Sequence, residues 1–431
     1  MSSSRDGIYE AGIVDPGIPN KDPTASFWQS ELHPLANHQS PWPSKPVDVA
    51  VIGAGITGVN VARPEPMLRG HWTQRRTYQN NSVANWKSHI QTYGLEEAIR
   101  LAIFEHSHLK VMMSAAEENG IDCDLVLTEG VDAYYDERTF KHALCDLEDM
   151  KTHVPELASQ YIVSTDRDYI KRVLKLSDRC IGTISVSAAS VWPYKLVTGL
   201  LSPLVHGGRL NLQTNTAVEQ IVDSREGESG VVRTSRGSII ARHIVHATNA
   251  WMGHLLPELR PFVSPVRGNV VHYASSKDAF GNVKDYDYII QRKSGDLVVG
   301  RANLGRRATS NDSQTDLAPM SHLRGLPHEV ALSPLPLAST TIDAAWSGIL
   351  AFTEDGSPFI GRLPSPSRAH QWVCGCYHGY GMTKAFRAAE MVVLMILGET
   401  LPEDYPRSML LTEERLRELA KDNDYMSSVC I

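Results

Sequence analysis

The sequence predicts an α/β (α+β) protein with a Rossmann-like nucleotide-binding domain, discontinuous in sequence, and a second domain with a mixed, largely antiparallel sheet. The first observation is Val47–Ile52, a short apolar run typical of a buried parallel strand, followed at once by Gly53, Gly55 and Gly58 in a Gly-x-Gly-x-x-Gly motif. The second is a series of short runs rich in Val and Ile, separated by Gly or polar turns, in the middle of the chain.

Length and composition indicate a globular protein. The chain has 431 residues, 42% of them apolar and 21% charged, which suggests two or three domains. The net charge of −7 gives no electrostatic reason to expect nucleic acid or an anionic membrane as partner. We expect a cytoplasmic protein, because no secretory signal or spanning segment is visible and the six cysteines are scattered.

Residues 1–47 read as an extended arm that carries Trp28 and Trp42, two side chains that could pin it to a surface. Helices are expected at 86–119, 140–150, 192–205 and 383–397. Strands are expected at 47–52, 125–135 (a pair around a turn), 210–214, 218–222, 230–234, 239–246, 266–273, 286–291, 297–300, 340–350 and 372–376. Residues 303–336 are expected to be loop.

Each glycine of the motif has a physical role in a dinucleotide site. Gly53 permits the tight turn, Gly55 lets the backbone approach a pyrophosphate, and Gly58 lets the helix pack close to the sheet. The helix start at Ile56 and Thr57 offers unpaired N–H groups to the phosphates. The alternative is a tight strand–helix turn that binds no ligand.

The stretch after the motif departs from this pattern. Pro64 and Pro66 stop the helix early, and Gln74–Asn81 contains no acid where a ribose anchor is expected, about 20 residues past the glycines. No metal site is expected either. His106 and His108 lie two residues apart and so point to different sides of a helix.

Several segments, in this order, carry a family resemblance: Val51–Gly58, Val191–Val197, Ile244–Trp251, Pro265–Gly268, Tyr288–Gly300, Trp346–Gly361 and Gly375–Thr383. Together they resemble the D-amino-acid oxidase (DAO) superfamily of FAD-dependent oxidoreductases. The resemblance is greatest to the glycine and sarcosine oxidase branch and its fungal relatives.

The resemblance implies roles for particular residues. Val218 is similar to the residue that meets the adenine end of FAD, and Ala247 and Thr248 resemble the loop that passes the flavin. The Gly-rich turn before the last long helix resembles the family stretch that faces the flavin ring, with Gly379, Gly381, Met382 and Thr383 as cofactor contacts. Tyr288 and Tyr380 are the implied catalytic residues at the substrate.

The resemblance also implies the chemistry. The enzyme would oxidise a C–N bond of a small-molecule amine or amino-acid-like substrate by hydride transfer to FAD, with oxygen as the electron acceptor, and would act in specialised metabolism. FAD would be held non-covalently, because no Cys follows the Trp346-Ser-Gly segment. Leu350 stands where relatives carry an Arg for the substrate carboxylate, so a bulkier or less charged amine is expected.

Arg69-Gly70-His71-Trp72 resembles the last fragment of a flavin-facing loop, which makes His71 a further cofactor candidate. The family's segment between Ala62 and about Arg69 looks excised, either through a missing exon or wrong gene model or in a natural variant that lost or altered FAD binding. Two other functions therefore stay open. One is a degenerate, non-catalytic relative, and the other is an NAD-dependent dehydrogenase that shares only the glycine motif.

The expected domain organisation follows from these motifs. The FAD-binding domain is assigned to residues 48–120, 181–260 and 355–425, and the substrate domain to residues 121–180 and 261–354.

Overall fold

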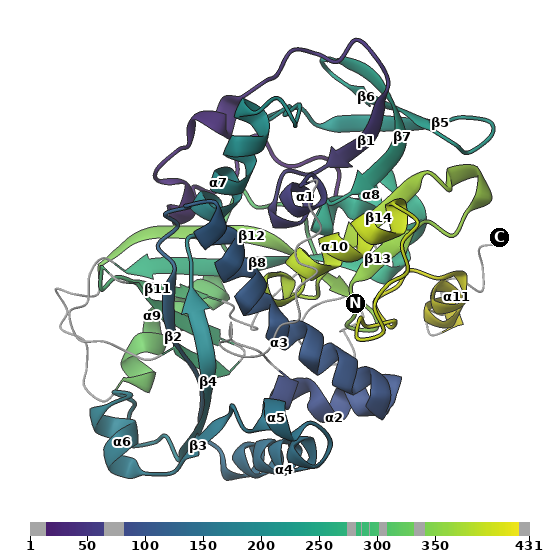
Figure 1. The fold of residues 1–431 in the computed structure, drawn as a ribbon. Helices are drawn as coiled ribbons and strands as arrows, with labels where there is room; N and C mark the ends of the chain where they lie inside the picture. The colour runs from purple at the N-terminus through teal and green to yellow at the C-terminus, as the bar shows by residue number, and fades with distance from the viewer. Residues whose placement is uncertain are drawn as a thin grey trace.

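The computed structural model describes residues 14–63, 82–273, 282–285, 287–292, 294–300, 308–331 and 341–421. These residues form two sheets, one of six strands and one of eight, with helices packed around both (Figure 1). This arrangement confirms the predicted α/β class.

The six-stranded sheet is centred on β7, which pairs in parallel with β1 through Val47↔Ala241 to Ile52↔His246. On its other edge β7 pairs with β14 in parallel and with β6 in antiparallel register. Its strands are β1 (Val47–Ile52), β5 (Val218–Asp223), β6 (Gly230–Thr234), β7 (Gly237–His246), β13 (Phe359–Arg362) and β14 (Gln371–Gly375). Within the described chain β1 pairs with β7 alone, so the second strand of a Rossmann fold is not seen beside it.

Two helices pack against this sheet where the glycine motif predicts a cofactor. In Figure 1, α1 (Ile56–Val61) and α10 (Ala385–Ile396) lie next to each other in front of the sheet. Their apolar side chains join one core with α3 (Leu95–Glu118), including Val61, Phe104 and Met391. The strong apolar character of α10 predicted from sequence is explained by this burial.

The eight-stranded sheet has the order β12-β8-β11-β10-β9-β2-β4-β3. The strands are β2 (Val126–Tyr134), β3 (Ile162–Ser164), β4 (Gly182–Ser190), β8 (Val263–Tyr273), β9 (Asn282–Asp285), β10 (Asp287–Gln291), β11 (Leu297–Gly300) and β12 (Ile342–Thr353). α9 (Leu317–Val330) covers one face, where Met320 and Leu323 pack on Val271 and Ile289.

The remaining helices support these layers. They are α2 (Ser82–Tyr93), α4 (Glu137–His153), α5 (Pro155–Ala158), α6 (Arg167–Arg172), α7 (Pro193–His206), α8 (Met252–Leu255) and α11 (Glu413–Lys421), with short 3-10 turns at η1 (Phe27–Gln29), η2 (Pro34–Asn37), η3 (Asn249–Trp251), η4 (Pro257–Phe262), η6 (Pro366–Arg368) and η7 (Gly381–Thr383). In the part of the chain that the structure describes, no helix is both long and apolar enough to cross a bilayer.

The structure differs from the expected elements at several places. The stretch expected as loop contains α9, which forms because its apolar side chains are buried against β8. Residues 125–135 form one strand rather than a pair, because all of β2 pairs with β4. The helix expected at 86–119 is interrupted at Gly94, where φ is +84°. Residues 210–214 contribute only an isolated bridge from Gln213 to Gln39.

The domain assignment also shifts at one boundary. The expected cofactor domain includes residues 181–260, but β4 pairs with β2 over nine residues and so lies in the other sheet. The change of sheet therefore falls near Ser190 rather than at residue 181.

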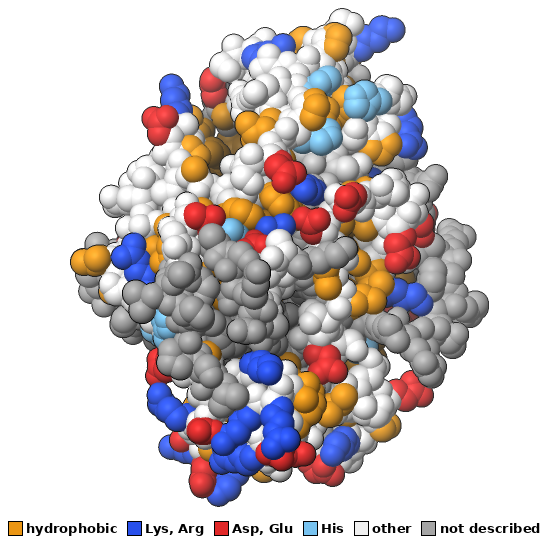
Figure 2. Space-filling model, turned by 90° about the vertical axis from the view of Figure 1, so that its left-hand side faces the viewer, with side chains coloured by type: hydrophobic (Ala, Val, Ile, Leu, Met, Phe, Trp, Pro, Cys, Tyr) orange, Lys and Arg blue, Asp and Glu red, His pale blue; other side chains and the backbone are white. Residues whose placement is uncertain are grey.

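The arm is held to the body of the protein through both tryptophans, as its sequence suggests. Trp28 accepts a hydrogen bond at its carbonyl from the Trp192 indole N–H (2.6 Å), and the Trp42 indole N–H donates to the Ser238 carbonyl (3.3 Å). On the face shown in Figure 2, basic side chains gather at the level of α6 with acidic ones among them. There Arg172 lies 3.7 Å from Asp168.

Candidate active site

The glycine turn after β1 is built so tightly that two of its glycines admit no side chain. At Gly53 φ is +110°, and a Cβ there would lie 2.5 Å from the Ala247 carbonyl oxygen. At Gly58 a Cβ would lie 1.8 Å from the Gly53 carbonyl oxygen. The Ala247 N–H in turn donates to the Ile52 carbonyl (2.9 Å), so Gly53 and Ala247 lie next to each other.

Gly55 is different, because a Cβ on this residue would meet no heavy atom of the described residues within 4 Å. Its φ of −79° and ψ of −169° are open to any residue, so neither backbone strain nor packing requires glycine here. Gly55 caps the start of α1, where backbone N–H groups point out of the first turn. Glycine at this position therefore keeps the space in front of the turn open for a ligand.

Asn249 joins the second predicted segment to the third. Its side-chain Oδ1 accepts hydrogen bonds from the backbone N–H groups of Cys376 (3.0 Å) and Tyr377 (3.3 Å). Asn249 itself has φ +46°, and a Cβ on Gly375 would lie 3.2 Å from the Asn249 Cα. The loop at Ala247–Asn249 and the Gly-rich turn therefore meet in space, although more than 100 residues separate them.

The Gly-rich turn carries backbone conformations that are uncommon outside glycine. φ is positive at Cys376 (+61°), His378 (+52°) and Gly379 (+81°). Local hydrogen bonds hold the turn, including that from the Tyr380 N–H to the Tyr377 carbonyl (2.9 Å) and that from the Thr353 N–H to His378 Nδ1 (3.2 Å). Non-glycine residues held in this region are typical of functional sites, where surrounding contacts fix a conformation that is unfavourable alone.

A buried hydrogen bond ties the turn to the glycine motif. The hydroxyl groups of Thr57 and Tyr377 lie 2.8 Å apart, and the Cys374 thiol lies 3.5 Å from the same Tyr377 oxygen. Burial holds the pKa of Tyr377 well above its usual value, so the phenol is neutral. Ile56 and Met382 add an apolar contact, since both pack on the cluster that contains Phe386.

A buried ion pair lies at the start of α10. Lys384 Nζ lies 2.7 Å from Glu105 Oε1, and both side chains are almost fully buried. The same ammonium lies 4.8 Å from the centre of the Tyr380 ring. His108 caps the helix, because its Nε2 accepts the Arg387 N–H (3.2 Å) while its Nδ1–H donates to the Phe104 carbonyl (2.9 Å).

The described residues fit an FAD. The hydroxyl of Thr248 and the indole N–H of Trp251 are buried and have no hydrogen-bond partner within the described structure. Unpaired buried polar groups are costly, and a bound ligand with acceptor and donor atoms would satisfy them. Thr248 lies beside the glycine turn, since a Cβ on Gly53 would lie 3.6 Å from the Thr248 backbone nitrogen, so at least this unpaired group is close to where the dinucleotide motif predicts a ligand.

Tyr288 belongs to the other sheet. It lies on β10 opposite Gly300, and its hydroxyl fills the space above that glycine, where a Cβ would be only 2.6 Å away. Gly300 lies opposite Val270, which lies opposite Trp346, so these four residues form one row across the sheet. Leu350 lies farther along β12 and packs with Val266 and Phe352.

The structure thus brings together most of the predicted cofactor residues: Gly53, Gly55, Ile56, Thr57, Gly58, Ala247, Thr248, Gly379, Gly381, Met382 and Thr383. Val218 opens β5 and packs on the cluster that contains Ile52. His71 lies outside the described residues. Among the described residues no group of three or more His, Cys, Asp and Glu side chains is placed to hold a metal ion.

Comparison with known sequences identifies the family, since residues 48–395 match the DAO family of FAD dependent oxidoreductases. The chain belongs to the DAO family. A "Probable oxidoreductase OrdL" of Rhizobium meliloti (strain 1021) is 24% identical over 416 residues, covering 88% of this chain and 92% of that protein. A glycine oxidase of Bacillus subtilis (strain 168) is 32% identical over 152 residues, which cover 33% of this chain and 38% of that protein.

Solved structures show the same fold for this DAO-family chain. The crystal structure of glycine oxidase from Geobacillus kaustophilus has a TM-score of 0.66 at 19% identity, over 86% of this chain and 99% of that one. That of L-proline dehydrogenase from P. horikoshii has a TM-score of 0.64 at 19% identity, over 83% of this chain and 95% of that one.

Sequence reasoning missed three contacts of the site: Asn249 with the turn, Thr57 with Tyr377, and Glu105 with Lys384. Each joins segments far apart in the chain, so no local pattern reveals it. The one available signal is Lys384 itself, a charged residue at the entry of a strongly apolar helix.

Proposed function

We propose that this DAO-family enzyme oxidises the C–N bond of a small-molecule amine at a non-covalently bound FAD, with oxygen as the electron acceptor. The observation that carries the proposal is the meeting of three segments beside the start of α1. These are the glycine turn, the loop at Ala247–Asn249 and the turn at Gly379–Thr383. When bound, FAD would supply hydride acceptance at this place.

Each segment would make its own contribution to the cofactor. The N–H groups at Ile56 and Thr57 would face the pyrophosphate across the cradle left by Gly55. Thr248 would donate or accept a hydrogen bond with its buried hydroxyl. The strained turn would present backbone N–H groups at Gly379–Thr383 to the electron-rich edge of the ring system.

Non-covalent binding is supported by the cysteines near the site. Cys374 and Cys376 are fully buried, and burial raises the pKa of the Cys374 thiol to about 12 and that of Cys376 further. Both residues are therefore protonated thiols at neutral pH. Because the thiolate is the reactive form, neither is suited to form a covalent bond to flavin. The free, scattered cysteines also support the proposed cytoplasmic location.

The residues near Leu350 support a substrate without a simple amino-acid carboxylate. Leu350 packs in an apolar cluster with Val266, the residue opposite it on β8. The next residue on β8, Arg267, points to the other face of the sheet. There the Arg267 guanidinium pairs with Asp316 (2.9 Å) and donates to the Asn311 carbonyl (2.7 Å). A bulkier or less charged amine therefore suits the site better than glycine.

We also propose that the two sheets have different functions, one in binding the cofactor and the other in binding the substrate. The six-stranded sheet, with residues 48–120, about 191–260 and 355–425, would hold FAD. The eight-stranded sheet would supply the substrate-binding surface, with Tyr288 on its face. Tyr380, in the Gly-rich turn, would approach the substrate from the cofactor side.

The experiment is to purify the chain, add FAD, remove the excess by gel filtration and record the visible spectrum. We expect flavin absorbance that elutes with the protein and bleaches without oxygen when an amine substrate is added. A folded chain without flavin bands would refute the proposal and favour the degenerate relative. Nicotinamide-dependent turnover without bound flavin would favour a dehydrogenase.

A further inference from the structure

A cavity of about 320 Å³ lies outside the cofactor site, where the arm meets the eight-stranded sheet. Its walls include Trp28 of the arm, Trp192 at the start of α7, and Ile290 and Arg292 on and just after β10. This volume is at the lower end of the range typical of small-molecule sites.

The cavity adjoins the proposed substrate position. Ile290 lies two residues beyond Tyr288 on the same face of β10, which places it about 7 Å farther along the strand. Trp346 lies in the same row as Tyr288, and its ring centre is 6.5 Å from that of Trp28. One continuous face of the sheet therefore runs from Tyr288 to the cavity.

The charged side chains at and beside the wall are already engaged in ion pairs with one another. Arg292 Nη1 lies 2.7 Å from Asp296 and Nη2 lies 3.0 Å from Asp124, while its guanidinium stacks on Trp192 at 4.7 Å. Lys195, which stacks on the same ring at 4.2 Å, pairs with Glu31 at 2.9 Å. A charged ligand group would have to break one of these pairs, whereas a neutral one would not.

The aromatic rings at this wall pack against one another. Trp28 meets both Trp192 and Trp346 edge to face, with interplanar angles of 68° and 82°. Phe27, next to Trp28, stacks on His272 with ring centres 3.7 Å apart. Flat aromatic walls favour planar apolar groups, because ring faces and edges can pack against them at little cost in side-chain entropy.

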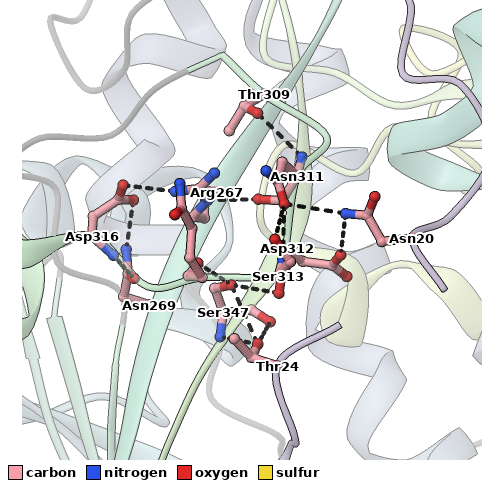
Figure 3. A network of polar contacts seen from close by, with 11 residues as sticks. Asn20, Thr24, Arg267, Asn269, Thr309, Asn311, Asp312, Ser313, Asp316 and Ser347 are labelled. Atoms are coloured by element: carbon pink, nitrogen blue, oxygen red, sulfur yellow. Dashed lines mark hydrogen bonds and ion pairs between the residues drawn. The ribbon is translucent and has the colours of Figure 1, made fainter. Parts of the chain in front are cut away.

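The arm is fixed in this position by a network of polar contacts (Figure 3). The Asn20 side-chain amide donates to Asp312 (2.8 Å), and the Thr24 N–H donates to the Asp312 carbonyl (2.8 Å). Thr24 Oγ1 accepts the Ser347 N–H (2.9 Å) on β12, the edge strand, one residue from Trp346. The arm thus passes around the edge of the sheet at β12, and its contacts hold Trp28 in position as part of the cavity wall.

We propose that this cavity receives a neutral aromatic ring carried by the amine substrate, so that the substrate class is an arylalkylamine and the arm is part of the substrate site. The inference rests on the proposed function, because that function places the reacting amine at Tyr288. The ring would lie between Trp28 and Ile290, one short alkyl linker away from the reacting carbon.

The test uses binding rather than turnover. The full chain with FAD is titrated by calorimetry with 2-methyl-4-phenylbutan-2-amine, which carries the ring but no oxidisable C–H beside nitrogen, and with tert-butylamine, which lacks the ring. We expect the aromatic amine to bind at least about tenfold more tightly, as the burial of a ring in a hydrophobic pocket predicts.

Two variants should abolish this preference and one should leave it unchanged. Trp28→Ala removes the wall, and Ser294→Phe fills the cavity from an exposed position of its lining. Trp42→Ala is the matched control, because Trp42 lies on the same arm but packs against Arg236 and Gly237 instead. Flavin absorbance should stay the same in all three variants.

Three results would overturn the inference: equal binding of the two amines, a preference that survives both Trp28→Ala and Ser294→Phe, or tighter binding of putrescine than of the aromatic amine. The proposed function fails separately. A chain that binds no FAD but keeps the preference refutes the function alone, and a chain that binds FAD without the preference refutes this inference alone.

Discussion

The buried ion pair between Glu105 and Lys384 gives a prediction whose size can be worked out. The pair joins α3 to the residue that precedes α10, with Nζ and Oε1 2.7 Å apart and side-chain exposures of 2% and 5%. Glu105→Gln keeps the shape of the side chain but leaves the Lys384 ammonium buried without its carboxylate. Breaking a buried pair in this way costs about 3–5 kcal/mol.

This cost converts to a measurable shift in melting temperature. For 431 residues the entropy of unfolding is about 0.9 kcal/mol/K, so Tm should fall by about 3–6 °C. The assay is thermal unfolding followed by circular dichroism. Lys384 directly follows the turn proposed to face the flavin, so we also expect weaker FAD retention.

The controls separate the buried charge from a general loss of packing. The double variant Glu105→Gln/Lys384→Met removes both charges and should recover most of the lost stability. Glu137→Gln breaks an exposed pair with Lys141 and should change stability by less than about 0.5 kcal/mol. The reasoning is refuted if Glu105→Gln melts like the wild type, or if the double variant is as unstable as the single one.

Three other predictions concern the same site. Gly58→Ala should lower Tm or prevent folding, because its Cβ would lie 1.8 Å from a backbone oxygen; a variant that melts like the wild type would contradict this packing. Asn249→Ala leaves two N–H groups of the turn without their acceptor, so we expect a loss of about 1–3 kcal/mol in urea unfolding, and no loss would show that the turn holds itself. Burial lowers the pKa of His108 and of His246 from 6.5 to about 4, so between pH 6.5 and 4 the unfolded chain binds protons that the folded chain does not. Each should therefore remove about 1–2 kcal/mol of stability by pH 5, and equal urea midpoints at pH 7.5 and pH 5 would refute this.

Local patterns were enough to predict the elements around the cofactor. Val47–Ile52, the glycine turn and α10 each carry their signal within a few residues, as apolar periodicity or glycine spacing. The resemblance then identified the family from the order of such segments, and the match over residues 48–395 confirms it.

α9 shows why other elements could not be predicted. Its sequence contains Pro319 and Pro327 and lies within residues 303–336, for which the sequence predicts a loop. Pro319 lies in the first turn, where backbone N–H groups have no partner within the helix anyway. The helix forms because Met320, Leu323 and Val330 are buried against the sheet, and tertiary packing outweighs local propensity.

The cavity beside Tyr288 was also beyond the reach of local patterns. The sequence alone predicts only that the Trp28 side chain could hold the arm to the surface of the protein. The place of Trp28 in a wall with Trp192 and Arg292 depends on three segments far apart in the sequence that converge on one face of the sheet. Such a site becomes visible only once the register of β8, β10 and β12 is known.

The central claim is that the space in front of Gly55 holds FAD, and Gly55→Ala tests it most directly. A methyl group there meets no atom of the described residues within 4 Å and suits the backbone conformation, so we expect the stability of the fold to stay the same. The measurement is the visible flavin absorbance that elutes with the protein after gel filtration in excess FAD. We predict a flavin-bearing wild type and a variant with much less flavin, while the two proteins have the same Tm in the absence of FAD. Equal flavin in both proteins would contradict the account.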